Sequence, residues 1–313
     1  MRNLIQEYMV SSQYYAPRGR ERLMFLGEQI SHRHLSYDDR LVGIVGDAGS
    51  GKSSLIKGMF PGLELSNDDD AIHPAKIMQV RSAFDDLPEA ACYHLDIRFQ
   101  MAFMQMYEIV DYVNFILSRK RRVVIEHFNL IYPALGRNAD VIIGVGEEII
   151  VTRPSIFGPI PQSIYEIVHQ SLKYRKMAHT AEEVVMQVLK EHFNVCDNCY
   201  YSSDIRNGFA LKFPQEPVID FEKLTELSKA KIAENLDVSY YDEDHIKMGD
   251  KIIPCDGARF HVSNTSEIEQ FDLLKWFVKD KKNNHSALIG VVDGNLSNLE
   301  NRNTYYFLKR MYP

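Results

Sequence analysis

Short apolar runs alternate with amphipathic segments along the first half of the chain. Buried strands of a parallel sheet are predicted at four of these runs, 41–45, 122–126, 140–145 and 148–151. Helices are predicted over 20–35, within a helical lead-in at 1–40, and over 52–59 and 98–118. Strands that alternate with helices indicate an α/β fold, a three-layer arrangement in which helices cover both faces of a parallel sheet.

The pattern changes after residues 153–161, RPSIFGPIP, where three prolines and one glycine predict a loop. Two helices are predicted next, over 162–175 and 179–193. Short strands at 209–213, 238–241 and 286–292 follow, with a helix near 221–235 between the first two. This α+β pattern predicts a second domain, and we divide the chain into domains at 1–165 and 166–313.

Composition limits the class of protein. A chain of 313 residues with 45% hydrophobic and 25% charged residues is globular and long enough for about two domains. No apolar stretch approaches the roughly 18 residues of a membrane span, and the first residues lack the apolar core of a signal peptide, so we expect a cytoplasmic protein without a membrane partner. The four cysteines are too few for a disulfide framework and are expected to be reduced thiols or metal ligands.

The net charge of -7 argues against a broad nucleic-acid surface, and no DNA partner is expected. Arg119-Lys120-Arg121-Arg122 is the only dense basic run. Two interpretations of it stay open, a solvated helix end and a contact for an RNA backbone.

One motif carries specific chemistry. The residues Gly46-Asp47-Ala48-Gly49-Ser50-Gly51-Lys52-Ser53 match the pattern G-x-x-x-x-G-K-[ST] between a predicted strand and a predicted helix. The glycines let consecutive backbone N–H groups face a phosphate at the helix N-terminus. Lys52 is expected to reach the β- and γ-phosphates, and the Ser53 hydroxyl to ligate Mg²⁺. We therefore predict a site for ATP and Mg²⁺ over this loop and Ser54.

The first domain resembles the uridine kinase and phosphoribulokinase group of P-loop kinases. The resemblance is carried by the loop, by Leu65-Ser66-Asn67-Asp68-Asp69-Asp70 and by Val124-Ile125-Glu126-His127-Phe128-Asn129-Leu130-Ile131-Tyr132-Pro133. It implies that Asp68 takes a proton from the acceptor hydroxyl and that Glu126 lies near Mg²⁺ or the acceptor; a solvated turn is the alternative for Asp68. Asp96 is a weaker candidate for the same carboxylate role, and a helix N-cap is the interpretation that we favour for it. The arginine-rich lid of those kinases is missing, since residues 151–159 hold only Arg153.

Residues 179–275 resemble the second additional domain of alanyl-tRNA synthetases, which alanyl-tRNA editing proteins and threonyl-tRNA synthetases share. The matching pieces are His179-Thr180-Ala181-Glu182-Glu183, Ser202, Phe209-Ala210-Leu211-Lys212-Phe213, Gly249-Asp250 and the run from Pro254 to Ile268. The resemblance implies recognition of an aminoacyl group, alone or on tRNA.

Ligand chemistry points to a zinc site in this second domain. His179 and Glu183 are four apart and share one face of a predicted helix, and Cys255 and His261 lie in a later loop. Glu183 stands where the family has a second histidine, and two extra residues separate Cys255 from His261, so a vestigial polar pocket is the alternative. Gly257 would permit a bulge that absorbs the two residues. Cys196 and Cys199 form a single C-x-x-C motif without a second one. It is interpreted as two thiols in a turn, or as the source of a zinc ligand that replaces the missing histidine.

Three functions are consistent with these features. The first is an ATP-binding kinase-like protein, performing phosphoryl transfer or ATP hydrolysis, with a module that recognises an aminoacyl or tRNA-type ligand. The second is a metal-dependent aminoacyl-tRNA deacylase with a regulatory P-loop domain, and the third is a non-catalytic ATP-dependent binding protein. No synthetase core is present, so ligase activity is excluded.

Overall fold

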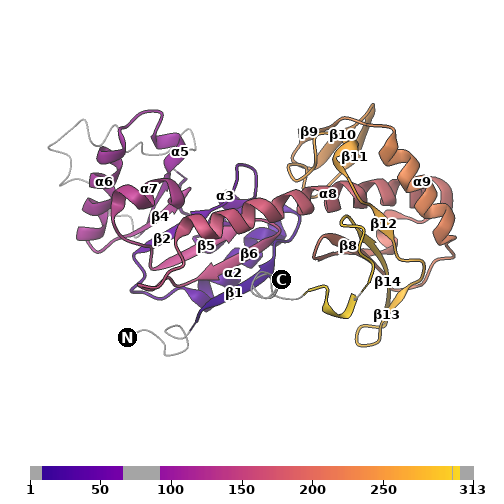
Figure 1. Ribbon diagram of the computed structural model, residues 1–313, viewed down its shortest axis with the longest axis horizontal. Coiled ribbons are helices and arrows are strands. Elements are labelled where there is room, and N and C mark those ends of the chain that lie inside the picture. The colour runs from indigo at the N-terminus through magenta and orange to yellow at the C-terminus, as the bar shows by residue number, and fades with distance from the viewer. Residues whose placement is uncertain (1–8, 66–91, 298, 304–313) are drawn as a thin grey trace. The chain divides into compact units, whose positions relative to one another are not determined.

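The computed structural model describes residues 9–65, 92–297 and 299–303. The chain forms two compact units (Figure 1). The first contains residues up to Ala16 together with Arg20–Gln170, and the second contains Pro17–Gly19 and the chain from Ser171 onward. No helix among the described residues combines the length and apolarity of a membrane span.

The first unit is built on a six-stranded sheet in the order β1-β6-β5-β2-β4-β3. Its strands are β1 (Ser11–Tyr15), β2 (Leu41–Val45), β3 (Cys92–Asp96), β4 (Arg122–Glu126), β5 (Val141–Val145) and β6 (Glu148–Thr152). Its helices are α2 (Arg20–His34), α3 (Lys52–Met59), α5 (Ile97–Gln100), α6 (Met106–Ser118), α7 (Phe128–Leu135) and the start of α8 (Pro161–Phe193). β3, β4, β2 and β5 are parallel neighbours, so the unit is a mixed α/β structure with a parallel core.

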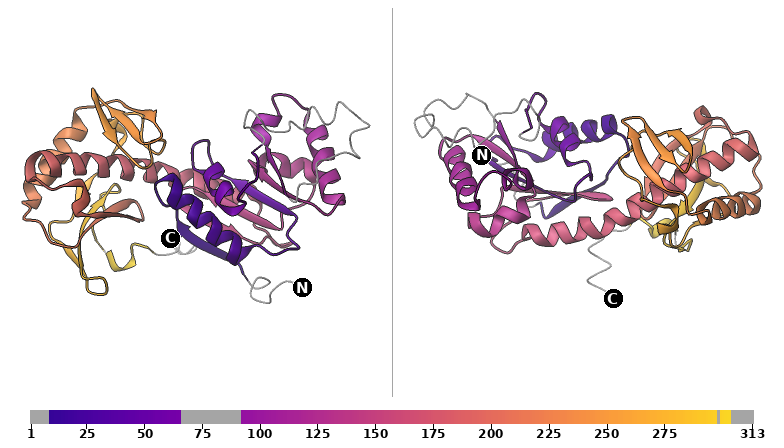
Figure 2. Two further views of the ribbon diagram at one scale, coloured as in Figure 1. Left: turned by 180° about the vertical axis from the view of Figure 1, so that it is seen from behind. Right: turned by 90° about the horizontal axis from the view of Figure 1, so that it is seen from above.

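Helices cover both faces of this sheet, as the alternation of side chains along each strand requires. On one face, Ile44 and Ile143 pack in a common core with residues of α2 and α3, and Figure 2 shows α2, in indigo, lying over the sheet. On the other face, a Cβ at Gly43 would lie 2.6 Å from Phe128 of α7, and one at Gly144 would lie 2.6 Å from Ile164 of α8. The glycines of β2 and β5 therefore allow α7 and α8 to approach closely.

The expectation of a parallel sheet was wrong for the edge formed by β1 and β6. β6 runs antiparallel to β5, because only Gly146 and Glu147 separate the two strands, and a parallel connection needs a crossover of about a dozen residues. β1 then pairs antiparallel with β6, from Ser11 opposite Thr152 to Tyr15 opposite Glu148. Within residues 9–40, the described part of the predicted helical lead-in, the chain forms the strand β1 followed by α2, and not a helix throughout.

Two helix predictions also need correction. The helix expected over 98–118 is divided into α5 and α6, because Gln105 is the N-cap of a new helix. The backbone N–H of Gln105 donates to the Glu108 side chain at 2.8 Å, as part of a capping box. The two helices expected at 162–175 and 179–193 are the single helix α8. The intervening Lys176, Met177 and Ala178 are strong helix formers, and no glycine or proline interrupts the chain there.

The second unit combines α9 (Phe221–Ala233) and the later part of α8 with two antiparallel sheets. One sheet has the order β12-β14-β8-β7, with β13 also paired to β14, and the other has the order β11-β10-β9. The strands are β7 (Tyr201–Ile205), β8 (Gly208–Phe213), β9 (Val238–Asp242), β10 (His245–Met248), β11 (Lys251–Pro254), β12 (Asp272–Leu273), β13 (Val278–Asp280) and β14 (His285–Val291). Short 3-10 helices span Asp197–Cys199, Thr265–Glu267 and Leu299–Asn301.

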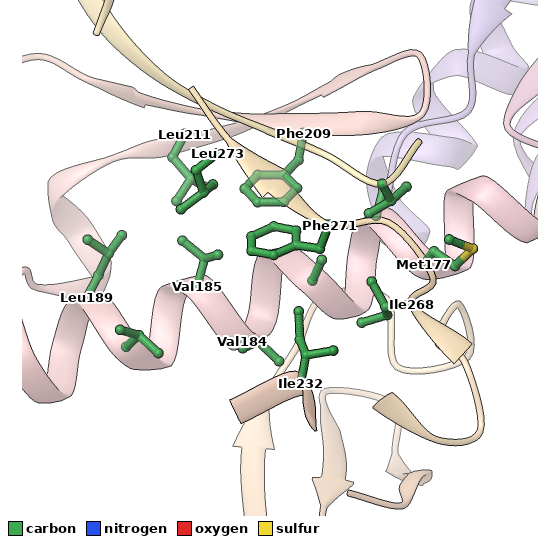
Figure 3. Packing of buried hydrophobic residues seen from close by; sticks show 14 of the residues in the cluster. Met177, Val184, Val185, Leu189, Phe209, Leu211, Ile232, Ile268, Phe271 and Leu273 are labelled. Atoms are coloured by element: carbon green, nitrogen blue, oxygen red, sulfur yellow. The ribbon is translucent and has the colours of Figure 1, made fainter. Parts of the chain in front are cut away.

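α8 provides the central apolar surface of the second unit. Figure 3 shows Phe209, Phe271 and Leu273 gathered against the stretch of α8 that carries Val185 and Leu189. These side chains are buried in one cluster with Ile232 of α9. Because the same helix carries His179 and Glu183, this packing fixes the backbone from which both polar side chains project.

A buried ion pair stabilises the first unit. Asp39 has no exposed surface, and its two oxygens accept hydrogen bonds from Arg153 at 2.7 and 2.6 Å. Burial acts to raise the pKa of Asp39, but the hydrogen bonds from Arg153 and Ser36 outweigh it and hold the pKa below its usual value of 3.8.

We predict that Arg153→Met destabilises the protein by about 3–5 kcal/mol, because Asp39 then stays buried without its cation. Since the pKa of Asp39 is lower in the folded state, its contribution is complete at neutral pH and is lost as the pH falls below about 4. Urea unfolding at pH 7 and pH 3 measures this. The difference in the free energy of unfolding between wild type and Asp39→Asn should be smaller at pH 3 than at pH 7. An equal difference at both pH values would contradict the predicted pH dependence.

Candidate functional site

The predicted phosphate loop joins β2 to α3 through residues 46–51, and Lys52, Ser53 and Ser54 form the first turn of α3. Gly46 and Gly51 have φ angles of 145° and 97°, which residues with a side chain rarely adopt. A Cβ at Gly46 would lie 2.5 Å from the carbonyl oxygen of Val145. The conformation of the loop therefore depends on glycine at these positions.

Lys52 is the buried cation of this loop. Its Nζ donates a hydrogen bond to the carbonyl oxygen of Asp47 at 2.7 Å and lies 3.6 Å from Oε2 of Glu126. Burial lowers the pKa of Lys52, and the charges of Glu126 and Asp96 counter part of that effect. The ammonium thus lies between the loop and the carboxyl ends of two neighbouring strands.

Glu126, the last residue of β4, receives hydrogen bonds from several directions. The Ser53 hydroxyl donates to its Oε1 at 3.0 Å, and His94 of β3 donates to the same oxygen at 3.2 Å. Burial acts to raise the pKa of Glu126, but the hydrogen bond from His94 and the charge of Lys52 lower it overall. An ionised carboxylate beside the Ser53 hydroxyl is a donor set that suits Mg²⁺.

A second carboxylate lies beside the first. Asp96 ends β3 and pairs in register with Glu126, and oxygens of Asp96 and Glu126 lie within 4.8 Å of each other and of a His127 nitrogen. Burial and the negative charge of Glu126 raise the pKa of Asp96. Its Oδ1 also accepts a hydrogen bond from the Phe99 N–H at 3.2 Å, so the predicted N-cap is confirmed, although the carboxylate also faces the loop region.

The sequence predictions for this site have different outcomes. Lys52, Ser53 and Glu126 lie together, as their interatomic distances show. Asp68 lies outside the described residues. Asp96 was offered by the sequence as a weaker candidate for the catalytic carboxylate, whereas His94 received no role. The available signal for His94 was a polar residue within the short strand CYHLD.

Asp47 of the loop is held by the first turns of α8. The Tyr165 hydroxyl donates to its Oδ1 at 2.9 Å, and His169 lies 2.6 Å from its Oδ2 through Nδ1. The rings of Tyr165 and His169 are stacked, with centroids 5.5 Å apart. These contacts hold the Asp47 end of the loop against α8.

In the second unit, three side chains of metal-binding type meet in a buried cluster. The Cys255 Sγ lies 3.5 Å from Nε2 of His179 and 3.2 Å from Nε2 of His261. His179 comes from α8, while Cys255 and His261 come from the loop after β11. The structure thus brings together three of the four residues predicted as zinc ligands.

Hydrogen bonds at the far side of each imidazole orient it. Nδ1 of His179 lies 3.3 Å from the carbonyl oxygen of Phe260, to which it donates. Nδ1 of His261 lies 3.3 Å from the Thr180 hydroxyl, which donates its own proton to the Lys176 carbonyl and is left to accept. Both Nε2 atoms therefore present lone pairs toward Cys255, which is the arrangement that surrounds a bound metal ion.

The fourth predicted ligand, Glu183, lies at the edge of this cluster. Its Oε1 is 3.7 Å from Nε2 of His179, and burial raises its pKa to about 7. Burial lowers the pKa of His261 to about 3, so its imidazole is neutral and able to ligate. Arg18, two residues before α2, is buried and forms ion pairs with the buried Glu182 and with the partly exposed Asp204, and its charge acts on both His179 and Glu183.

Residues 257–260, between Cys255 and His261, form a turn in which the Phe260 N–H donates to the Gly257 carbonyl at 2.9 Å. Gly257 is needed for space: a Cβ there would lie 2.8 Å from Cε1 of His179, and its φ is not positive. A substitution at Gly257 would therefore displace the imidazole of His179.

The expectation of reduced thiols was wrong for one pair of cysteines. Cys196 and Cys199 form a disulfide with Cα atoms 5.3 Å apart. The 3-10 turn Asp197–Cys199, closed by a hydrogen bond from the Cys199 N–H to the Cys196 carbonyl at 3.0 Å, brings them within bonding range. These cysteines are consequently not free to replace a metal ligand while the disulfide is intact.

Comparisons with known proteins give little further information. No family model matches the chain, and no curated protein matches it. One solved structure to which it shows similarity is the crystal structure of the SepCysS-SepCysE N-terminal domain complex, with 8% identity, coverage of 66% of this chain and a TM-score of 0.22. The similar region spans 64% of that chain. At so low a TM-score the similarity carries no argument about fold or function.

Proposed function

We propose that the first unit binds a nucleoside triphosphate, ATP, together with Mg²⁺, and catalyses phosphoryl transfer or hydrolysis. The observation that carries the proposal is the convergence of Lys52 and Ser53, from the loop, on Glu126 of the neighbouring strand. Ligands of open α/β sheets bind at the carboxyl ends of the strands, which is the edge where these residues meet.

Each residue has a distinct role in this proposal. The loop backbone and Lys52 hold the β- and γ-phosphates, while Ser53 and Glu126 hold Mg²⁺ directly or through water. The bound ion would neutralise charge that develops on the phosphates. Asp96, whose pKa is raised, accepts the proton of the attacking hydroxyl or water, a role that the family resemblance gives to Asp68.

We predict that Asp96→Asn and Glu126→Gln lower the rate of ATP hydrolysis by about 10²–10⁴-fold while changing ATP affinity far less. Each substitution keeps the shape of the side chain and removes a proton acceptor or a Mg²⁺ ligand. Asp68→Asn belongs in the same series, and Asp111→Asn, an exposed acid on α6, is the matched control. Phosphate release and calorimetric ATP titration measure the two quantities. Unchanged hydrolysis in all three site variants would favour an ATP-dependent binding protein without turnover.

A second candidate function concerns the second unit. The Nε2 atoms of His179 and His261 both present a lone pair toward Cys255, which supports a bound zinc ion. Glu183 would be the fourth ligand or a base. We propose that this unit recognises an aminoacyl group, alone or on tRNA. A zinc ion with an open position would supply a nucleophilic water, as a deacylase requires, whereas a closed site would serve binding.

A further inference from the structure

Arg98 is an exposed arginine at the carboxyl edge of the first unit's sheet. It lies in α5, two residues after Asp96, which itself faces Glu126 across the β3–β4 pair. Within the described part of the chain, its guanidinium makes neither an ion pair nor a hydrogen bond. Two acids of this region have other partners: Asp96 is the N-cap of α5, and Asp47 is held by Tyr165 and His169 of α8.

The charge of Arg98 acts on the groups that define the phosphate end of the site. It contributes to lowering the pKa of His127 to about 4, after burial and the charge of Lys52, and it also lowers the pKa of Lys52. The charge of Arg98 also contributes to lowering the pKa of Asp47. Arg98 is therefore within electrostatic reach of Asp47 and Lys52, and its helix begins at the carboxyl end of β3, where Asp96 and Glu126 meet.

The other arginine that the sequence offered for this task is already occupied. Arg153, the one arginine in the stretch that replaces the kinase lid, is bound through two hydrogen bonds to Asp39 and has a side chain only 7% exposed. It also donates to the carbonyl oxygen of His34. A residue held in this way cannot turn toward a nucleotide without leaving Asp39 buried and unpaired.

We propose that Arg98 binds the γ-phosphoryl group of the nucleotide and stabilises its charge during transfer. This inference rests on the proposed function of the same site. In the reaction, the bond between the γ-phosphorus and the bridging oxygen breaks and a bond from the attacking oxygen forms. ADP leaves with the electron pair, and the proton of the attacking group passes to Asp96. Arg98 takes no part in the proton transfer, because a guanidinium remains charged.

The test compares ATP with ADP. For Arg98→Ala we expect ATP affinity to fall by about 10-fold or more, as for the loss of a charge-assisted hydrogen bond, while ADP affinity stays unchanged. ATP hydrolysis should fall by about 100-fold or more. Arg98→Lys, which keeps a charge without the fork of donors, should give intermediate values.

Arg137→Ala is the matched control, since Arg137 is an exposed arginine of the same unit. It follows the C-terminal end of α7, whereas Glu126 and His127 lie before the N-terminal end of that helix. The control variant should leave both affinities and hydrolysis unchanged. Equal losses for ATP and ADP in Arg98→Ala, or no loss for either, would overturn the inference while leaving the nucleotide site in place. A wild-type protein that binds neither nucleotide would instead overturn the proposed function itself.

Discussion

The Lys52→Ala variant is expected to bind ATP–Mg²⁺ about 100-fold more weakly than the wild type. Lys52 is buried between the loop and Glu126, where its ammonium would meet the β- and γ-phosphates in a low-dielectric setting. Removing it leaves the carboxylate of Glu126 without a neighbouring cation, which further disfavours an anionic ligand. Isothermal titration calorimetry with ATP and GTP in the presence of Mg²⁺ measures the change.

Lys57→Ala provides the control on the same helix, because Lys57 lies in the last turn of α3, away from the loop. Its affinity should equal that of the wild type. Calorimetry that detects neither ATP nor GTP binding to the wild-type protein would reject the nucleotide site altogether. Equal binding by Lys52→Ala and the wild type would show that the nucleotide binds elsewhere.

The wild-type protein is expected to contain about one zinc ion per chain, and Cys255→Ser is expected to lose it. A thiolate is the only anionic ligand among the three clustered side chains, and two neutral imidazoles alone hold zinc weakly. Because metal binding contributes directly to folding free energy, the variant should unfold more readily in its second unit while it keeps its affinity for ATP.

Metal analysis of protein purified without chelators gives the zinc content, and thermal unfolding with and without chelator gives the stability. Cys92→Ser is the control: Cys92 is a partly buried thiol in β3 of the first unit, where burial raises its pKa to about 12. It should leave the zinc content unchanged. Zinc near zero in a folded wild-type protein would mean a vestigial polar pocket and would exclude deacylation by a metal-bound water.

The elements that local sequence determines were predicted well. β2 and β5 are unbroken apolar runs, and α3 follows the loop motif, so the prediction of these three elements does not depend on distant residues. The antiparallel β6 and the added strand β1 could not be predicted in the same way. The direction of β6 depends on how tightly Gly146 and Glu147 turn, and β1 exists only because β6 offers an edge for pairing.

The candidate site shows the same division. The loop lies within eight consecutive residues, so its backbone requirements are visible in the sequence. The place of Asp96 beside Glu126 depends on the pairing of β3 with β4, and the unavailability of Arg153 depends on Asp39, which lies far from it along the chain. In the second unit the residue types of the candidate ligands were visible, whereas the role of Thr180 in orienting His261 emerged only from the contact between α8 and the loop that follows β11.

The membership of Arg18 in the second unit has a consequence for how the protein is made. Arg18 is synthesised before helix α2, whereas its partners, the buried Glu182 and the partly exposed Asp204, appear only after the first unit has been translated. A fragment that begins at Ser171 would bury the Glu182 carboxylate without its cation, at a cost of about 3–5 kcal/mol for such a broken pair. Arg18 therefore stays without these partners until the residues from Ser171 onward have been synthesised, and a single cut of the chain cannot separate the two units.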